Sequence, residues 1–328
     1  MKLYPLKFTP IYKEKIWGGR RLEDVYGRRL PAGVRIGESW DVSDHGDDVS
    51  RVESGAWAGR SLRELIAEMP VEILGSALVM RCLERFPLLV KLIDASENLS
   101  LQVHPPDDYV AVHERGEWGK TELWYVVRAD EGAELVCGFR TAVARGAFAR
   151  ALEEGTLLNL LRPLKTHDGD AIFVPAGRVH SIGAGNLIFE IAENSDVTYR
   201  LYDWERAGSA RPLQIKKAME VVNFGDGRDP RIAATWEDKK GFRRAHLATC
   251  RHFRTVQVEI GDVWGSIRTG ERFSIISVVR GSGALEYGDA GEIIELRSGD
   301  TLLLPAALGG YRVRAGTNCC NILETEVP

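Results

Sequence analysis

A short segment occurs twice in this chain, and it restricts the possible folds more than any other feature of the sequence. Residues 169–176 read GDAIFVPA and residues 299–306 read GDTLLLPA. Each copy combines a Gly-Asp turn, four mostly apolar residues typical of a buried strand, and a Pro-Ala stop. Each copy also follows a segment that reads as an earlier strand of the same unit, which for the second copy is FSIISVVRGSG at 273–283. The repeat therefore predicts two related β-units in tandem.

The repeat and the strand patterns around it resemble a tandem pair of cupin units, which are double-stranded β-helices of the jelly-roll type. We expect a mainly β fold with a few short helices, at residues 61–69, 141–154, 157–164 and 212–222. A break in the polar run at 237–241, preferred to one at 226–230, divides the chain. Residues 1–240 are then a metal-binding catalytic domain with helical segments, and residues 241–328 a C-terminal cupin-like domain without metal.

Composition excludes several classes of partner. The 328 residues carry a net charge of -4 and 44% are hydrophobic, whereas nucleic acids and anionic membranes favour a strongly basic face. The N-terminus has no signal-peptide pattern, and no apolar stretch is long enough to cross a bilayer. The five cysteines lack C-x-x-C spacing, which indicates reduced thiols in a cytoplasmic protein. The sequence does not indicate an oligomeric state.

Four side chains have the spacing of a metal site. Gln102 and His104 are two residues apart in the run LSLQVH, so in a strand they point to the same face. Glu122 opens the apolar run LWYVV, and His180 follows the first copy of the repeat, where the second copy has no imidazole. Two imidazoles and a carboxylate, with an amide oxygen as a weaker fourth ligand, suit Zn, Mn or Fe. These residue types do not choose between the metals, and other cupins with such ligands hold Fe, Mn or Ni.

Four blocks, in this order, resemble the type I phosphomannose isomerase (mannose-6-phosphate isomerase) family. They are LSLQVHPPD (99–107), GKTELWYV (119–126), GDAIFVPAGRVHSIGAG (169–185) and ENSDVTYRLYDW (193–204), and WGG at 17–19 is similar to the family's opening motif. The length resembles the short bacterial and archaeal branch. Longer members carry a His where this chain has Gly119, and an Ala-Gly-x-Thr-Pro-Lys run after the residue matching Arg200. Roles of that His and that Lys are not carried over.

The resemblance implies an enzyme that interconverts mannose 6-phosphate and fructose 6-phosphate through an enediol. It implies one zinc per chain, held by Gln102, His104, Glu122 and His180, and a small sugar phosphate as partner. Isomerisation of an aldose to a ketose moves a proton between C1 and C2. The reaction therefore needs a base near the carbon, a group that polarises the carbonyl, and a grip on the phosphate.

Three residues are candidates for the catalytic work. Lys120 lies two residues before Glu122 and shares its strand face, where a nearby metal and burial would lower its pKa and give a neutral amine as base. The resemblance places Arg200 in the active site, and its guanidinium suits a phosphate or a developing enediolate oxygen. Asp196 fits as the partner of Arg200 or as a second acid–base group.

Four residues are weaker candidates for substrate binding. Ser100 and Ser181 flank ligands and can donate to phosphate or sugar hydroxyls, although strand and turn hydroxyls are equally consistent with the pattern. Trp17 suits a wall of the sugar pocket or the core. Glu190 is a further candidate.

Other functions stay open on the sequence. A sugar-binding cupin without turnover would tolerate the loss of Lys120 or Arg200, and the presence of both favours the enzyme. A cupin dioxygenase would usually have a second histidine in place of Gln102. A glucose-6-phosphate isomerase of the cupin type has a different arrangement of its metal motif.

Overall fold

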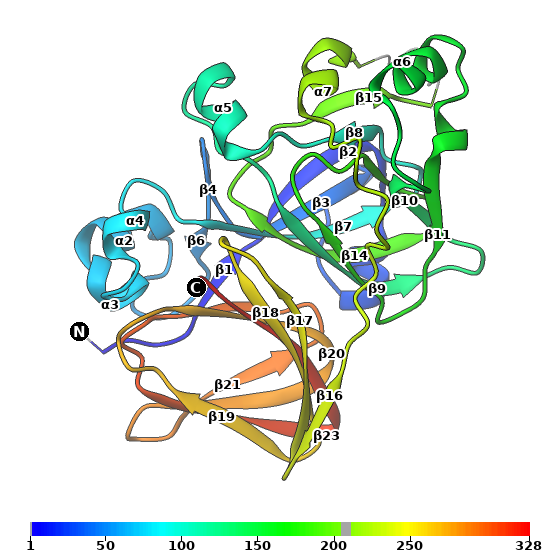
Figure 1. Cartoon of the computed structure of the whole chain (residues 1–328). Coiled ribbons are helices and arrows are strands. Elements are labelled where there is room, and N and C mark those ends of the chain that lie inside the picture. Colours follow the sequence, from blue (N-terminus) through cyan, green and yellow to red (C-terminus); the bar gives the residue numbers. More distant parts are fainter. Residues whose placement is uncertain (1, 205–210) are drawn as a thin grey trace. The chain divides into compact units, whose positions relative to one another are not determined.

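Strands dominate the structure, and the helices are short, which confirms the mainly β fold expected from the sequence. The computed structural model describes residues 2–204 and 211–328 (Figure 1). The central unit comprises Tyr12–Glu38 and Leu92–Ile232, and the C-terminal unit comprises Met1–Ile11, Ser39–Lys91 and Ala233–Pro328. Each unit is therefore assembled from separate stretches of chain. The functional division into residues 1–240 and 241–328 stays a prediction.

Two antiparallel sheets form the β-structure of the central unit. The five-stranded sheet has the order β11 (Leu161–Lys165), β10 (Glu134–Phe139), β13 (His180–Ile182), β8 (Leu101–Val103) and β15 (Tyr199–Tyr202). The six-stranded sheet has the order β12 (Ala171–Val174), β9 (Glu122–Ala129), β14 (Asn186–Glu193), β7 (Leu88–Ala95), β3 (Ile36–Val42) and β2 (Ile11–Gly19). One core cluster draws on both sheets, with Trp124 of β9 and Ile182 of β13 among its members, so the sheets pack face to face.

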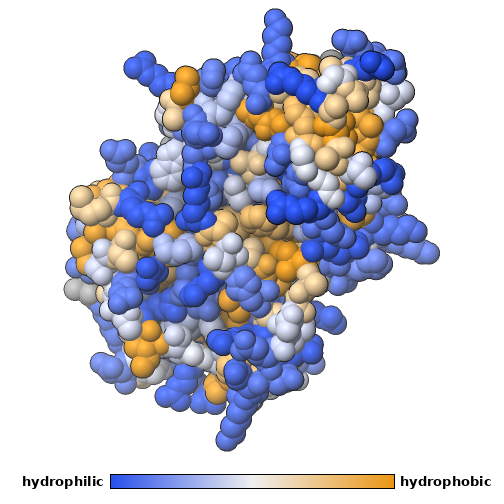
Figure 2. All heavy atoms as spheres, in the orientation of Figure 1, coloured by the Kyte–Doolittle hydropathy of each residue, from blue (hydrophilic) through white to orange (hydrophobic). Residues whose placement is uncertain are grey.

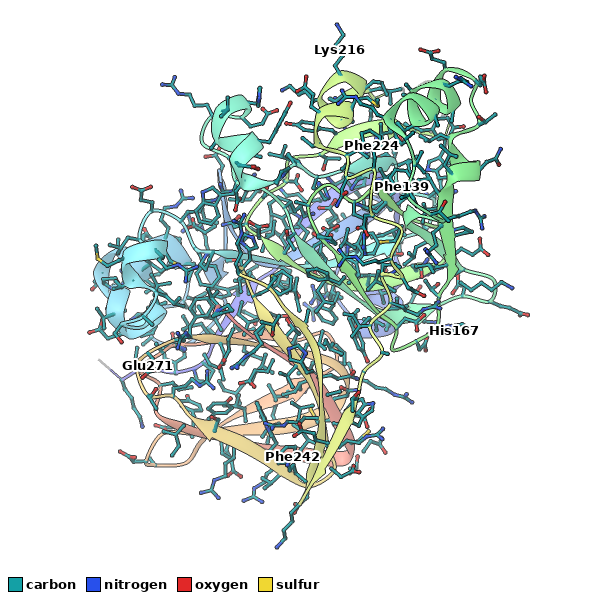
Figure 3. The ribbon with its side chains drawn as sticks, viewed as in Figure 1. Phe139, His167, Lys216, Phe224, Phe242 and Glu271 are labelled. Atoms are coloured by element: carbon teal, nitrogen blue, oxygen red, sulfur yellow. The ribbon has the colours of Figure 1, made fainter. Side chains whose placement is uncertain are left out.

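A helical layer covers the outer face of the five-stranded sheet. Its helices are α6 (Arg145–Glu153), the 3₁₀ turn η1 (Leu157–Leu160) and α7 (Ile215–Val221), and Leu101 and Val103 of β8 belong to the same apolar cluster. Phe139 and Phe224 stack in this layer with ring centroids 6.4 Å apart (Figure 3). Because strand side chains alternate, Gln102 between the two buried residues of β8 points to the inner face. The helices thus cover one face of β8 and leave Gln102 on the opposite face, toward the six-stranded sheet. The remaining helices of this unit are α1 (Arg21–Tyr26) and α5 (Asp107–His113).

The C-terminal unit is built on a ten-stranded sheet. Eight strands follow the order β16 (Trp236–Lys239), β17 (Phe242–Thr249), β18 (Arg254–Ile260), β23 (Gly310–Glu326), β20 (Ser274–Tyr287), β22 (Thr301–Leu304), β1 (Leu6–Thr9) and β6 (Arg51–Val52). Off this path, β19 (Val263–Ile267) pairs with β23 and β21 (Glu292–Arg297) with β20. The unit also holds β4 (Asp44–His45), β5 (Asp48–Val49), α2 (Leu62–Glu68), α3 (Pro70–Leu74) and α4 (Val79–Cys82).

The repeated segments occupy corresponding places in the two units. The first copy forms β12, whose Val174 pairs with Glu122 at the start of β9. The second copy forms β22, whose Leu304 pairs with Ser274 at the start of β20. The tandem arrangement predicted from the repeat is therefore confirmed at the level of strand pairing.

Local signals predicted some helices well and others poorly. The capping box at Ser61 and Glu64 is present at the start of α2. The helix expected at 141–154 begins later, at Arg145. The helical turn expected at 157–164 ends at Leu160, because the next residues pair with β10 as strand β11. The helix expected at 212–222 is α7, Ile215–Val221.

The surface is mostly polar. Figure 2 shows a largely hydrophilic face on which hydrophobic residues gather in small areas. Large exposed hydrophobic side chains include Met80 and Ile267, which are 85% and 72% exposed. Within residues 2–204 and 211–328, we find no helix with the length and apolar character needed to cross a membrane. All five cysteines are free thiols.

Candidate functional site

Three buried side chains with metal-ligand atoms converge in the central unit. His104 follows β8, Glu122 opens β9 and His180 opens β13, so both sheets contribute. The Nε2 atoms of His104 and His180 lie 3.7 and 3.5 Å from Oε1 of Glu122. None of the three residues is more than 2% exposed. Their ligand atoms all lie within 4.8 Å of one another, so the group is able to hold a metal ion.

Backbone carbonyls orient both imidazoles. Nδ1 of His104 lies 2.7 Å from the carbonyl oxygen of Val197, and Nδ1 of His180 lies 2.9 Å from that of Arg178. A carbonyl accepts hydrogen bonds and cannot donate them, so each Nδ1 carries the proton. The Nε2 lone pairs are therefore directed at the Glu122 carboxyl group, as in metal-ligating histidines.

Gln102 joins this group from β8. It pairs directly with His180 of β13, and its amide nitrogen donates to Nε2 of that histidine at 3.3 Å. The Ser100 hydroxyl donates to Oε1 of Gln102 at 3.0 Å. A half-turn of the amide would bring Oε1 beside the imidazole, and the Ser100 hydroxyl would then accept a hydrogen bond. Ser100 thus acts on Gln102 in either orientation.

The separations between these atoms fit a tetrahedral ion. Ligand atoms 2.0–2.2 Å from a tetrahedral metal lie roughly 3.4 Å from one another. The corresponding separations in this cluster are 3.3, 3.5 and 3.7 Å. Two neutral imidazoles, a carboxylate and an amide are also an acceptable donor set for zinc. The residues therefore fit a divalent metal.

Lys120 and Glu190 extend the cluster along the inner face. The Lys120 ammonium lies 2.9 Å from Oε2 of Glu122 and 2.8 Å from Oε1 of Glu190, and it is 4% exposed. Burial acts to lower the pKa of Lys120, but Glu122 and then Glu190 outweigh burial and raise it above its ordinary value. These contacts favour an ammonium in the metal-free chain. The neutral amine expected from the sequence concerns Lys120 beside a bound metal and stays a prediction.

Burial disfavours the charged forms of two ligand residues. It lowers the pKa of His180 to about 4, so this imidazole is neutral at neutral pH. Burial, followed by the carboxylate of Glu190, raises the pKa of Glu122 to about 8. A cation beside Glu122 would favour its carboxylate form.

Arg200 continues a row of inner-face side chains across the five-stranded sheet. It pairs with Gln102, which in turn pairs with His180, so the three side chains point to the same side. Arg200 is half-buried, and its Nε finds no acceptor within the part of the chain that the structure describes. Burial, followed by the charge of Arg211, lowers the pKa of Arg200. Asp196 lies in the loop between β14 and β15, is exposed, and acts electrostatically on both Arg200 and Lys120.

Two of the weaker candidates lie elsewhere. Trp17 is 3% exposed and belongs to the core cluster between the sheets. Ser181 follows His180 directly in β13, so it points to the opposite face, and its hydroxyl donates to the carbonyl oxygen of Leu99 at 2.8 Å. The structure therefore brings Ser100 and Glu190 together with the ligand residues and does not bring Ser181 there.

Other groups occupy the corresponding positions in the C-terminal unit. Ser274 pairs with β22 as Glu122 pairs with β12. His180 lies 11 residues after Gly169, and the residue 11 positions after Gly299 is Gly310, which has no ligand side chain. A serine and a glycine thus occupy the positions of the carboxylate and of the His180 imidazole.

Two carboxylates hold Arg268 in the C-terminal unit. Arg268 donates to Oε1 of Glu326 at 2.6 Å, and its guanidinium lies 3.4 Å from Oε1 of Glu324. The Tyr311 hydroxyl donates to the same oxygen of Glu324 at 3.0 Å. The guanidinium is therefore fixed among carboxylates.

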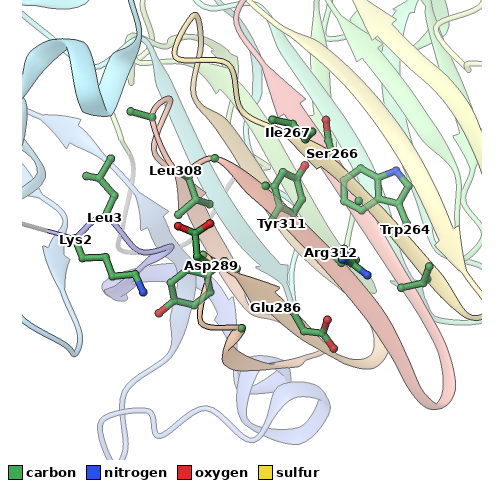
Figure 4. A pocket seen from close by; sticks show the side chains of 18 of the residues that line it. Lys2, Leu3, Trp264, Ser266, Ile267, Glu286, Asp289, Leu308, Tyr311 and Arg312 are labelled. Atoms are coloured by element: carbon green, nitrogen blue, oxygen red, sulfur yellow. The ribbon is translucent and has the colours of Figure 1, made fainter.

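A hollow of about 1100 Å³ also lies in the C-terminal unit (Figure 4). Trp264, Tyr311 and Leu308 line it together with charged side chains such as Glu286 and Arg312. Glu286 is paired with Arg314 at 2.6 Å. None of the described residues that line this hollow is a histidine. The candidate site is therefore identified by its metal-ligand side chains in the central unit and not by the volume of this hollow.

The residues that orient the ligands were not recognised in the sequence. The carbonyls of Val197 and Arg178 act through the backbone, which leaves no residue-type signal. A buried pair between Arg178 and Asp226 holds one of these segments, with Nε 2.8 Å from Oδ2. Arg178 stands between Pro-Ala-Gly and His180 in the sequence, but no pattern indicates that Asp226, 48 residues later, is its partner.

Comparisons with known proteins find relatives over nearly the whole chain. A sequence model described as "Phosphomannose isomerase type I, catalytic domain" matches residues 5–122. The chain is 36% identical over 322 residues to mannose-6-phosphate isomerase ManA of Bacillus subtilis (strain 168), which covers 97% of this chain and 98% of the relative.

Solved structures of similar fold also cover nearly the whole chain. The crystal structure of the mannose 6-phosphate isomerase from Bacillus subtilis is similar with a TM-score of 0.88 and 34% identity, over 98% of this chain and 99% of that chain. A mannose 6-phosphate isomerase bound with zinc and yttrium has a TM-score of 0.75 at 17% identity, a likeness of fold.

Proposed function

The chain belongs to the type I phosphomannose isomerase family, and we propose that the cluster of His104, Glu122 and His180 is its active site. The chain interconverts mannose 6-phosphate and fructose 6-phosphate, an aldose–ketose isomerisation. A sugar-binding protein without turnover is not favoured. The observation that carries the assignment of the site is the convergence of two oriented imidazoles on one buried carboxyl group.

We propose one zinc ion per chain, held by His104, His180, Glu122 and the amide oxygen of Gln102. The donor set and the separations of 3.3–3.7 Å support a divalent ion. A relative of the same fold is bound with zinc and yttrium. When bound, the ion supplies Lewis acidity toward the sugar oxygens.

Lys120 is proposed to exchange a proton with the substrate. Its ammonium lies beside Glu122, where it would donate to the oxygen of the reacting carbonyl as negative charge develops on that oxygen. The amine left after donation is still held by Glu190 and would take back a proton from the other enediol hydroxyl as the ketose forms. The proton that leaves C2 passes to a base and returns to C1, and Asp196, exposed and electrostatically coupled to Lys120 and Arg200, is the candidate for this second acid–base group.

We expect Arg200→Ala to lower activity on mannose 6-phosphate by about 10²–10³-fold, because a charged donor in the active site is lost. A loss mainly in kcat would mean that Arg200 faces the enediolate, and a loss mainly in KM that it grips the phosphate. Arg140→Ala, at an exposed arginine of the same unit, is the control and should leave both constants unchanged. Wild-type kinetics in Arg200→Ala would exclude a role for this residue with the substrate.

One experiment tests the proposal as a whole. The purified chain is analysed for metals and assayed on mannose 6-phosphate with a coupled detection of fructose 6-phosphate, before and after treatment with a chelator. We expect about one zinc per chain, loss of turnover after chelation and its return with zinc. Full turnover by metal-free protein would contradict the proposed site. A divalent ion ligated within residues 241–328 would contradict the prediction that this domain is metal-free, which rests on the absence of a histidine after the second copy of the repeat.

The remaining expectations concern surroundings. The substrate is a small sugar phosphate, and a net charge of -4 gives no basis for binding nucleic acid. We propose the cytoplasm as the compartment, because five free thiols are typical of a reducing environment.

A further inference from the structure

A tight turn delivers His180 to the metal cluster. In this turn the backbone nitrogen of Arg178 donates to the carbonyl oxygen of Pro175 at 3.2 Å, and Gly177 has a positive φ of 83°. The nitrogen of Gly177 donates to the carbonyl oxygen of His104 at 2.8 Å, so the turn also contacts the other ligand segment. The position of His180 therefore depends on how rigidly residues 175–179 are held.

A buried ion pair holds this turn. Nε of Arg178 lies 2.8 Å and a terminal nitrogen 2.6 Å from Oδ2 of Asp226, and the other terminal nitrogen donates to the carbonyl oxygen of Phe173 at 2.8 Å. The side chains of Arg178 and Asp226 are 4% and 2% exposed. Three charge-assisted hydrogen bonds leave Arg178 a single conformation. The carbonyl group of that same residue accepts the hydrogen bond from Nδ1 of His180.

Asp226 is itself anchored on a loop that follows α7. Within this loop the nitrogen of Asn223 donates to the carbonyl oxygen of Gly177 at 2.8 Å. Arg162 of β11 donates to the carbonyl oxygen of Gly227 at 2.7 Å. The loop at residues 223–227 is thus tied to the sheet on one side and to the ligand turn on the other.

We propose that Asp226 is a positioning residue for the metal centre. By holding Arg178 it fixes the carbonyl group that keeps the proton of His180 on Nδ1 and its Nε2 toward Glu122. Groups that orient a metal-ligating histidine in this way also set the affinity of the site. The part of the inference that concerns metal rests on the proposed function, whereas the orientation of His180 is a property of the metal-free chain.

The zinc dissociation constant of the full chain tests the first part, by competition with a chromophoric chelator. We expect Asp226→Asn to weaken zinc binding by about 10-fold. Glu326→Gln is the control, because it breaks a partly buried arginine–carboxylate pair in the C-terminal unit, and its zinc affinity should equal that of wild type. Equal zinc affinity in Asp226→Asn and wild type, or an equal loss in the control, would overturn the proposal.

The imidazole tautomers in the metal-free chain test the second part. Nitrogen NMR of histidine-labelled protein should report the Nδ1–H form for His180 in wild type and a mixture of tautomers in Asp226→Asn, with His104 unchanged. If the single substitution fails to fold, the double variant Arg178→Met/Asp226→Leu removes both buried charges together and should show the same mixture. A His180 tautomer that is unchanged in the variant that folds would refute the positioning role. Zinc-free wild-type protein with full turnover would instead refute the proposed function and leave the tautomer result intact.

Discussion

Replacing His180 with alanine is expected to remove bound zinc almost completely and to lower turnover by about three orders of magnitude or more. The imidazole lies 3.5 Å from Oε1 of Glu122 on a side chain that is 1% exposed, so no other group can take its place. Loss of Lewis acidity costs several kcal/mol of transition-state stabilisation, and each factor of ten in rate corresponds to about 1.4 kcal/mol. Elemental analysis of the purified variant, together with the coupled assay, measures both effects.

The fold should survive this substitution. Truncating a buried side chain typically lowers the free energy of unfolding by roughly 0.5–3 kcal/mol, against the 5–15 kcal/mol of an ordinary domain. His167→Ala is the control, since this histidine of the same unit is 75% exposed at the surface (Figure 3). Its metal content and turnover should match those of wild type. Equal zinc content in His180→Ala and wild type would rule out the ligand assignment.

Replacing Lys120 with methionine is expected to lower kcat by roughly 10²–10⁴-fold while zinc stays bound. Methionine keeps the length and apolar stem of lysine but has no proton to exchange. The ammonium contacts Glu122 through Oε2 at 2.9 Å, whereas the two imidazoles face Oε1, so its loss leaves the ligand oxygen in place. Steady-state kinetics on mannose 6-phosphate measure kcat, and zinc analysis of the same sample measures the retained metal.

Lys216→Met serves as the comparison for this variant. Lys216 lies on α7 and points into solvent (Figure 3), so its replacement should change neither kcat nor zinc content. Near-wild-type turnover in Lys120→Met would refute proton transfer by this residue. The assignment of the proton-transfer group would then shift toward Asp196 or a metal-bound water. Loss of zinc in Lys120→Met would show that its charge supports the metal cluster instead of the reaction.

Much of the fold was predictable because the sequence repeats a strand segment. The two Gly-Asp…Pro-Ala segments lie at corresponding places as β12 and β22, each paired with the start of a longer strand. The predictions that were wrong concern segments whose structure is set by distant partners. Residues 161–164 have a helical pattern, but Leu161 pairs with Phe139 and Leu164 with Leu135, and strand pairing overrides the local preference.

The site was predictable where its residues have chemical types and spacing that are unusual for a core. Gln102, His104, Glu122 and His180 are polar groups within apolar strand patterns, and the structure brings them together. The contact of Lys120 with Glu190 was not predictable, because Glu190 lies 70 residues further along the chain. The orientation of the imidazoles depends on backbone carbonyls and on Asp226, for which a single sequence has no signature.

The guanidinium of Arg268 has a consequence for how the C-terminal unit responds to metal. A bound ion exchanges with its surroundings, but a charge on the polypeptide cannot dissociate. If the central unit holds an ion as proposed, its ligand group depends on the supply of that ion, whereas Glu324 and Glu326 keep their contacts with Arg268 whatever that supply is. We therefore expect a chelator to leave these contacts of the C-terminal unit unchanged.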